Sequence, residues 1–176
     1  MRTFIAIETN QEVQEELKRI QNKISYGVFK KTNDFHITLK FLGEKNDFEI
    51  ERIKEKLSEI KFKSFQITIE KIGFFPNENF IRVVWVGTKE REVFELQKLI
   101  DQKLLELKIP AEKEFQSHIT IARVKQINDK KKFLESIKSI NIKNISFKVT
   151  EFKLKKSVLT PKGPIYSDLG VFKLQD

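Results

Sequence analysis

The sequence predicts an α+β fold in which two related halves form one bilobal domain. Strand-like and helix-like segments alternate along all 176 residues, and several segments of the first half recur 82 residues later. In addition, 39% of the residues are hydrophobic, including 16 Phe, which excludes a disordered chain and supplies large side chains for one core. We therefore expect a single domain, 1–176, built from repeats of about 1–82 and 83–176.

Period-two alternation predicts the strands up to residue 87, because successive side chains of a strand point to opposite faces. These strands cover 4–8, 35–42, 65–75 and 80–87, with Gly43 ending the second and the turn 76–79 joining the last two. Apolar residues spaced three or four apart predict helices over 11–24 and 48–60.

The second half shows the same order of elements. Helices are expected over 93–107 and 130–140, and strands over 118–124, 145–154 and about 166–174, the last after a loop at 161–164.

The recurrence has one register. Residues 64–68 match 146–150, residues 36–39 match 118–121, and helix 11–25 matches 93–107, all at an offset of 82. A shared offset indicates a duplicated unit with pseudo-twofold symmetry. We expect each lobe to be a mainly antiparallel sheet with helices packed outside, and a central cleft between the lobes as the ligand site.

Residue counts restrict the chemistry and indicate the charge of a partner. The chain has no Cys, so disulfides, a thiol nucleophile and Cys-based metal sites are excluded, and His36 and His118 are its only histidines. The net charge is +9, and the residues from 123 onward hold thirteen basic and five acidic side chains. A basic terminal third favours an anionic partner such as RNA, although a solvated lysine surface would have the same composition.

Both histidines stand in the pattern His-x-Thr. In a strand, His36 shares a face with Thr38, and His118 shares one with Thr120, while the intervening Ile residues face the core. One imidazole is then able to accept a proton while the other donates one, and the hydroxyls are able to bind anionic oxygens. This set suits in-line displacement at phosphorus. No His-x-His or His-x-x-x-His spacing is present, so we expect no metal site and no cofactor.

The segments FHITLKFLG (35–43) and SHITIARV (117–124) resemble the two signature motifs of the 2H phosphoesterase superfamily. The opening RTFIAIE and the ending KKSVLTPKGPIYSDLGVFKL are similar to its RNA 2′,3′-cyclic phosphodiesterase family, formerly called 2′-5′ RNA ligases. The resemblance implies an enzyme that hydrolyses terminal 2′,3′-cyclic phosphates of RNA or nucleotides to 2′-phosphates, with weak reverse 2′-5′ ligation. Its partner would be such an RNA or nucleotide.

Residue by residue, the resemblance makes His36 and His118 the catalytic pair and Thr38 and Thr120 the phosphate-binding threonines. Arg123 matches a phosphate-binding basic residue, but its odd spacing from His118 requires a bulge or the end of the strand. Lys40 stands at an even spacing from His36 and is therefore expected to point into the cleft and bind phosphate. To produce a 2′-phosphate, the acid must stand beside the 3′-oxygen; we assign His36 as acid and His118 as base.

Aromatic residues are candidates for stacking a terminal base, although core packing is the competing interpretation for each. The candidates are Phe41, Phe74, Phe75 and Tyr166. Lys156 and Ser157 are candidates for contact with an RNA backbone.

Two alternatives remain open. One is another 2H activity, on a cyclic ADP-ribose phosphate, a 2′-5′ oligonucleotide or an RNA 3′ end; the other is a non-catalytic RNA-binding protein. The N-terminal apolar run is too short for a signal peptide or a membrane span, so we expect a soluble, cytoplasmic and monomeric protein.

Overall fold

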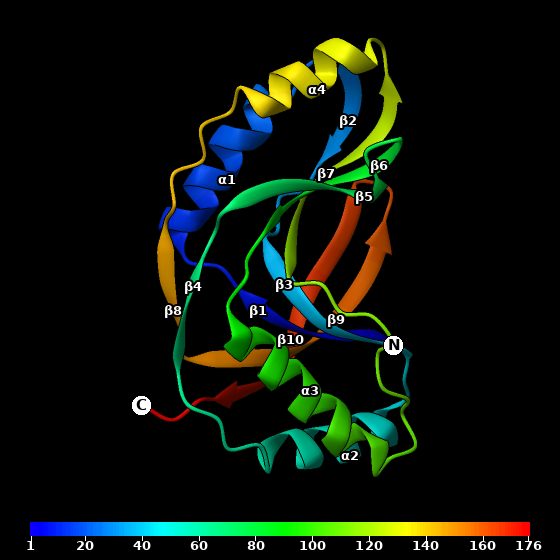
Figure 1. Ribbon diagram of the computed structural model, residues 1–176. Helices are drawn as coiled ribbons and strands as arrows, with labels where there is room; N and C mark the ends of the chain where they lie inside the picture. Colours follow the sequence, from blue (N-terminus) through cyan, green and yellow to red (C-terminus); the bar gives the residue numbers. More distant parts are fainter.

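The computed structural model describes residues 1–176 and contains four helices and ten strands (Figure 1). The helices are α1 (Gln11–Lys23), α2 (Asp47–Ser58), α3 (Arg91–Leu105) and α4 (Lys130–Lys138). The strands are β1 (Arg2–Glu8), β2 (Gly27–Lys31), β3 (His36–Glu44), β4 (Phe65–Thr68), β5 (Lys71–Asn77), β6 (Phe80–Gly87), β7 (His118–Ile127), β8 (Ser146–Val149), β9 (Glu151–Thr160) and β10 (Gly163–Lys173). This is the predicted α+β class.

Eight strands form one sheet in the order β10-β9-β1-β3-β7-β6-β5, and β2 pairs with β7 on the same side as β3, farther along the strand. Every pairing between these strands is antiparallel, and β4 and β8 form a separate two-stranded sheet. The long sheet is joined in its middle by a single pairing, Ile37 with Ile119, between β3 and β7. The strands on each side of this junction therefore form two lobes.

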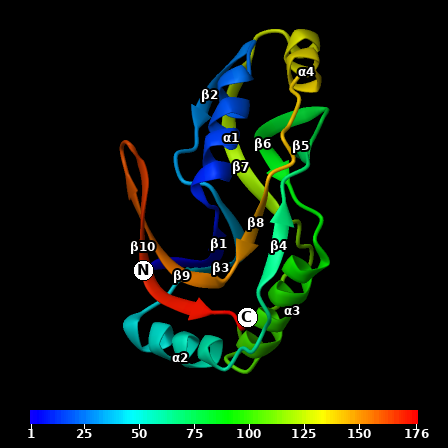
Figure 2. The same ribbon diagram turned by 90° about the vertical axis from the view of Figure 1, so that its left-hand side faces the viewer.

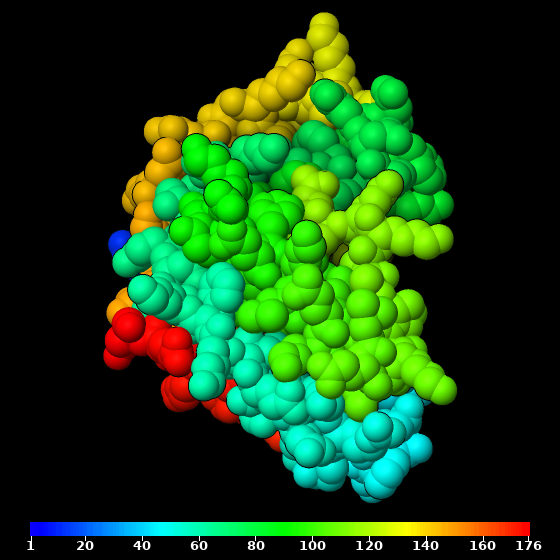
Figure 3. Space-filling model, turned by 60° about the horizontal axis from the view of Figure 1, so that its bottom comes forward, coloured from blue at the N-terminus to red at the C-terminus, as the bar shows by residue number.

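Each lobe combines elements of both sequence halves. The β3 lobe contains β1, β3, β9 and β10 with α2 and α3, and the β7 lobe contains β2, β5, β6 and β7 with α1 and α4 (Figures 1 and 2). Helix α1 follows β1 in the chain but packs on β7, and α3 follows β6 but packs on β3. One outer surface of the β3 lobe is formed by α2 and α3, as the cyan and green atoms of Figure 3 show.

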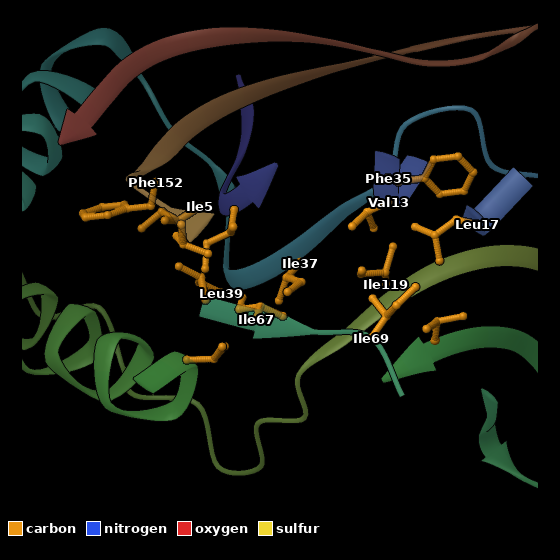
Figure 4. Packing of buried hydrophobic residues seen from close by; sticks show 14 of the residues in the cluster. Ile5, Val13, Leu17, Phe35, Ile37, Leu39, Ile67, Ile69, Ile119 and Phe152 are labelled. Carbon is orange, nitrogen blue, oxygen red and sulfur yellow. The ribbon is translucent and has the colours of Figure 1, made fainter. Parts of the chain in front are cut away.

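The core runs continuously through both lobes as one cluster of 35 buried residues. At the junction, Ile37 and Ile119 point toward Ile67 and Ile69, so the β4 segment covers this side of the sheet (Figure 4). The opposite side of the junction carries the polar residues of β3 and β7.

Two predicted strands were wrong in extent, and one strand was not predicted. Segments 65–75 and 145–154 are each divided between a strand of the small sheet and a strand of the large one. The strand that was not predicted is β2. Strands β9 and β10 form a hairpin that extends to Thr160 and resumes at Gly163, beyond the predicted ends at 154 and about 166.

Candidate active site

The Ile37–Ile119 pairing brings the two His-x-Thr segments together. Continuing its antiparallel register by one residue places His36 across from Thr120 and His118 across from Thr38. Both Ile side chains are fully buried, whereas the His and Thr side chains are partly exposed on the other face. The structure therefore gathers two imidazoles and two hydroxyls on one face at the junction of the lobes.

A β-bulge follows each His-x-Thr segment and reverses the alternation of side chains. The register of β1 on β3 shifts at Leu39, and the register of β6 on β7 shifts at Ile121. Two consecutive residues are buried at each bulge, and Phe41 and Arg123 then return to the face of the histidines, both exposed. Phe41 and Arg123 are 82 residues apart, so one half offers an aromatic ring where the other offers a guanidinium.

The prediction that Lys40 points into a cleft is wrong, because the bulge turns this side chain into the interior. Lys40 is 2% exposed; its Nζ lies 2.5 Å from Asp101 Oδ1 and donates to the Pro110 carbonyl at 2.8 Å. Asp101 stands on α3 and also accepts from the Gln97 amide and the Glu112 backbone N–H. Lys40 thus ties β3 to α3 rather than binding phosphate.

Aromatic rings flank each histidine. On the β3 lobe, the ring of His36 lies 5.2 Å from Phe4 and 5.5 Å from Tyr166, and Phe4 in turn contacts Phe41. On the β7 lobe, the ring of His118 lies 4.8 Å from Phe75 and 6.2 Å from Trp85.

Of the predicted stacking residues, Phe41, Phe75 and Tyr166 lie near the histidines and Phe74 does not. Phe74 faces the other way and packs on Phe133 of α4, with ring centroids 6.0 Å apart. Its assignment to nucleotide binding is therefore wrong, because neighbouring positions of β5 face opposite sides.

The structure also places residues at the site that the sequence analysis did not single out. Phe4 and Trp85 contact the two imidazoles, and Asp34 Oδ1 lies 3.1 Å from His36 Nδ1. The corresponding partner of His118 Nδ1 is the backbone carbonyl of Gln116, at 2.7 Å. Asp34 stands two residues before His36, and this short spacing from the motif is a signal that the sequence contains.

The surroundings shift several pKa values. Burial lowers the pKa of His118, and the nearby positive groups of His36 and Arg123 act in the same direction. The hydrogen bond from His36 lowers the pKa of Asp34, which is therefore ionised at neutral pH. Burial raises the pKa of the Tyr166 hydroxyl.

An ion-pair network connects β1, β9 and β10 next to His36, because Glu8 of β1 lies opposite His36. Lys155 binds both Glu8 and Asp168, and Lys153 lies 2.6 Å from Glu8 and 2.9 Å from Asp168. Two lysines of the basic terminal third are thus already neutralised by carboxylates, whereas Lys156 forms no ion pair, and Ser157 lies opposite Tyr166 in the β9–β10 hairpin. Position as well as net charge decides which lysines are available to an anion.

Three cavities of the molecule, one of them lined by Glu8 and Lys153 of the ion-pair network, have neither histidine in their walls. A central cleft therefore stays a prediction. No three His, Asp or Glu side chains are clustered in a way that would hold a metal ion. None of the four helices has the length and apolar character needed to cross a membrane.

The family model described as LigT-like phosphoesterase matches residues 7–85 and again 86–166. The chain is 39% identical to the RNA 2′,3′-cyclic phosphodiesterase of Archaeoglobus fulgidus, over 98% of this chain and 100% of the relative. It is 38% identical to the protein of the same name from Methanocaldococcus jannaschii, over 94% and 96% of the two chains. The crystal structure of TT0787 of Thermus thermophilus superposes with a TM-score of 0.82 at 28% identity, covering 99% of this chain and 98% of that one.

Proposed function

The chain belongs to the LigT-like phosphoesterase family and is a phosphodiesterase, and from this premise we propose that it opens terminal 2′,3′-cyclic phosphates of RNA or nucleotides to 2′-phosphates. The observation that carries this proposal is the pair of His-x-Thr segments on one face at the Ile37–Ile119 junction. Two imidazoles on opposite sides of a bound phosphate supply the base and the acid that in-line hydrolysis needs.

The proposed reaction consists of two proton transfers and one displacement at phosphorus. Neutral His118 takes a proton from water at Nε2 while the water oxygen forms a bond to phosphorus. The bond from phosphorus to the 3′-oxygen breaks, and protonated His36 gives its Nε2 proton to that oxygen. The products are a 2′-phosphate and a 3′-hydroxyl, and solvent returns both imidazoles to their starting states.

Binding of the phosphate is assigned to groups on the same face. The hydroxyls of Thr38 and Thr120 donate to the non-bridging oxygens, and Arg123 supplies a positive charge after the bulge. These donors stabilise the charge that develops on the phosphoryl oxygens in the transition state. Phe41, Phe75 and Tyr166 are the rings available to the terminal base.

The experiment uses an RNA oligonucleotide that ends in a 2′,3′-cyclic phosphate, incubated with the protein in EDTA. We expect conversion to a 2′-phosphate end, which resists a 3′-specific phosphatase and is identified by ³¹P NMR. A 3′-phosphate product would contradict the assignment of the leaving oxygen. A shortened RNA would indicate trimming instead, and binding without any product would indicate a binding protein.

A further inference from the structure

The two histidines are held at Nδ1 by different chemical groups at equivalent positions of the repeat. Asp34 and Gln116 each lie two residues before a histidine and are separated by the offset of 82. Asp34 uses its side chain, with Oδ1 3.1 Å from His36 Nδ1, whereas Gln116 uses its backbone carbonyl, 2.7 Å from His118 Nδ1. The two halves of the duplicated framework are therefore alike in shape but differ in charge at this point.

Both contacts fix the same tautomer. An ionised carboxylate and a carbonyl only accept hydrogen bonds, so Nδ1 must carry the hydrogen in both rings. The Nε2 atom of each histidine is then left for the substrate. This part of the arrangement is common to the two halves and decides no difference in role.

The charge of the acceptor does decide a difference. Asp34 places a negative carboxylate oxygen 3.1 Å from His36 Nδ1, where it orients the ring and offsets the positive charge that the ring carries when it acts as the acid. Partial burial against Phe75 and Trp85 lowers the pKa of His118, and this outweighs the hydrogen bond to the neutral Gln116 carbonyl, which raises it.

Other charged groups near the two histidines do not remove the difference between the charged acceptor at His36 and the neutral acceptor at His118. Those facing the two rings from the neighbouring strands are Glu8, Lys155, Asp168, Arg123 and the hydroxyl of Tyr166. Lys155 is bound to both Glu8 and Asp168, so its charge is compensated within the network. Arg123 is positive and opposes protonation of His118. Asp34 is the one carboxylate that hydrogen-bonds a histidine.

We infer that Asp34 is a positioning residue that makes His36 the general acid, leaving His118 as the general base. The inference rests on the proposed phosphodiester hydrolysis and adds to it the residue that breaks the symmetry of the site. Asp34 touches neither water nor phosphate in this scheme; it acts through the orientation and charge state of His36.

The first test is the Asp34→Asn variant, assayed with adenosine 2′,3′-cyclic phosphate across pH. This change keeps the shape and an acceptor oxygen but removes the charge. We expect kcat to fall about tenfold or more, as for other groups that orient a reactive histidine, with KM changed less than about twofold.

The matched control is Glu114→Gln, which removes one carboxylate from the corresponding loop before β7. Glu114 is exposed and forms no hydrogen bond or ion pair, so its replacement should leave kcat and KM unchanged. An equal effect of both variants would show that net charge, rather than the contact with His36, is responsible, and would overturn the inference.

A second substrate separates an effect on the acid from a general loss of structure. In the analogue with sulfur in place of the 3′-oxygen, the leaving thiolate needs no proton, so Asp34→Asn and His36→Ala should recover most of their lost rate while His118→Ala should not. Equal losses on both substrates would contradict the assigned role. If the wild-type protein opens neither substrate, the proposed function itself fails.

A measurement on the wild-type protein keeps the inference testable even if the variants fold poorly. The ¹⁵N chemical shifts of the His36 ring should report hydrogen on Nδ1 in the neutral ring. Hydrogen on Nε2 instead would mean that the contact with Asp34 does not set the tautomer, and would overturn the inference without reference to activity.

Discussion

His36 and His118 occupy equivalent positions of a duplicated framework, yet the side chains around them differ. His36 lies between Phe4 and Tyr166 beside Asp34, and His118 lies against Phe75 and Trp85. Beyond the bulges, Phe41 in the first half occupies the position that is equivalent to Arg123 in the second half. A symmetric pair of motifs thus gives an asymmetric site, as a reaction with distinct attacking and leaving oxygens requires.

The pKa of His118 leads to a prediction about the pH dependence. Burial lowers this pKa below the ordinary value of 6.5, so the neutral ring that the proposed mechanism needs as its base persists below pH 6.5. As pH falls through the lowered pKa, His118 becomes protonated and the activity is lost. We expect the acid limb of the kcat/KM profile to lie below pH 6.5, measured with adenosine 2′,3′-cyclic phosphate. An acid limb at or above that pH would contradict the assignment of His118 as base.

At the residue scale, the sequence was sufficient for the faces of His36, Thr38, His118 and Thr120, because two-residue alternation holds up to each bulge. It failed at Lys40, since a bulge has no local signature and shifts every later residue to the other face. The repeat contained the missing information. Arg123 requires a bulge to turn toward the site. A bulge at the equivalent point of the first half, 82 residues earlier, turns Phe41 toward the site and Lys40 away from it.

Among the strands, β5 and β6 carry the two aromatic rings that flank His118, Phe75 and Trp85. Trp85 of β6 packs across Gly73 of β5, where no side chain intervenes, and its ring lies 5.1 Å from Phe75. A Cβ built at Gly73 would lie 2.2 Å from the Trp85 ring. A glycine at this point therefore permits the close approach that positions the aromatic neighbours of His118.

Gly73→Ala is expected to displace Trp85 and, through it, His118. Overpacking of this kind costs about 1–3 kcal/mol of the free energy of unfolding. We expect a lower midpoint of unfolding in urea and a reduced kcat, with Gln66→Ala, at an exposed position of β4, as the control. Unchanged stability together with unchanged kcat would show that the Trp85 packing does not support the site.

The helices and most strands could be predicted from periodicity, because their apolar stripes or alternation match one buried face. Strand β2 could not, since its five residues are mostly exposed and pair only with the edge of β7. The equivalent residues 109–113 form no strand, so the repeat did not reveal it either. Pairing with a distant partner, rather than local sequence, determines such a strand.

At the scale of the whole molecule, the lobes and the sequence halves do not coincide. Strand β5 from the first half completes the β7 lobe, β9 from the second half completes the β3 lobe, and helices α1 and α3 exchange places in the same way. One continuous core connects them. This exchange was not predictable from the 82-residue register, which relates segments but does not say which lobe each one joins.

The exchange predicts that the two lobes unfold together. Trp85 is the single tryptophan and reports on the β7 lobe, whereas far-ultraviolet circular dichroism reports on both lobes. We expect urea unfolding curves from the two signals to coincide, as in a two-state transition. Separated midpoints would show that the lobes are independent folding units.

The turnover of an RNA 2′,3′-cyclic phosphate end shows whether His36 and His118 act as one acid–base pair. Wild type, His36→Ala, His118→Ala and the double variant are compared. Each single variant should lose about 10²–10⁴ in kcat, because each removes one proton transfer. The double variant should lose little more than either single one, because residues that act as a unit are not additive. Near-normal turnover by either single variant would contradict the account.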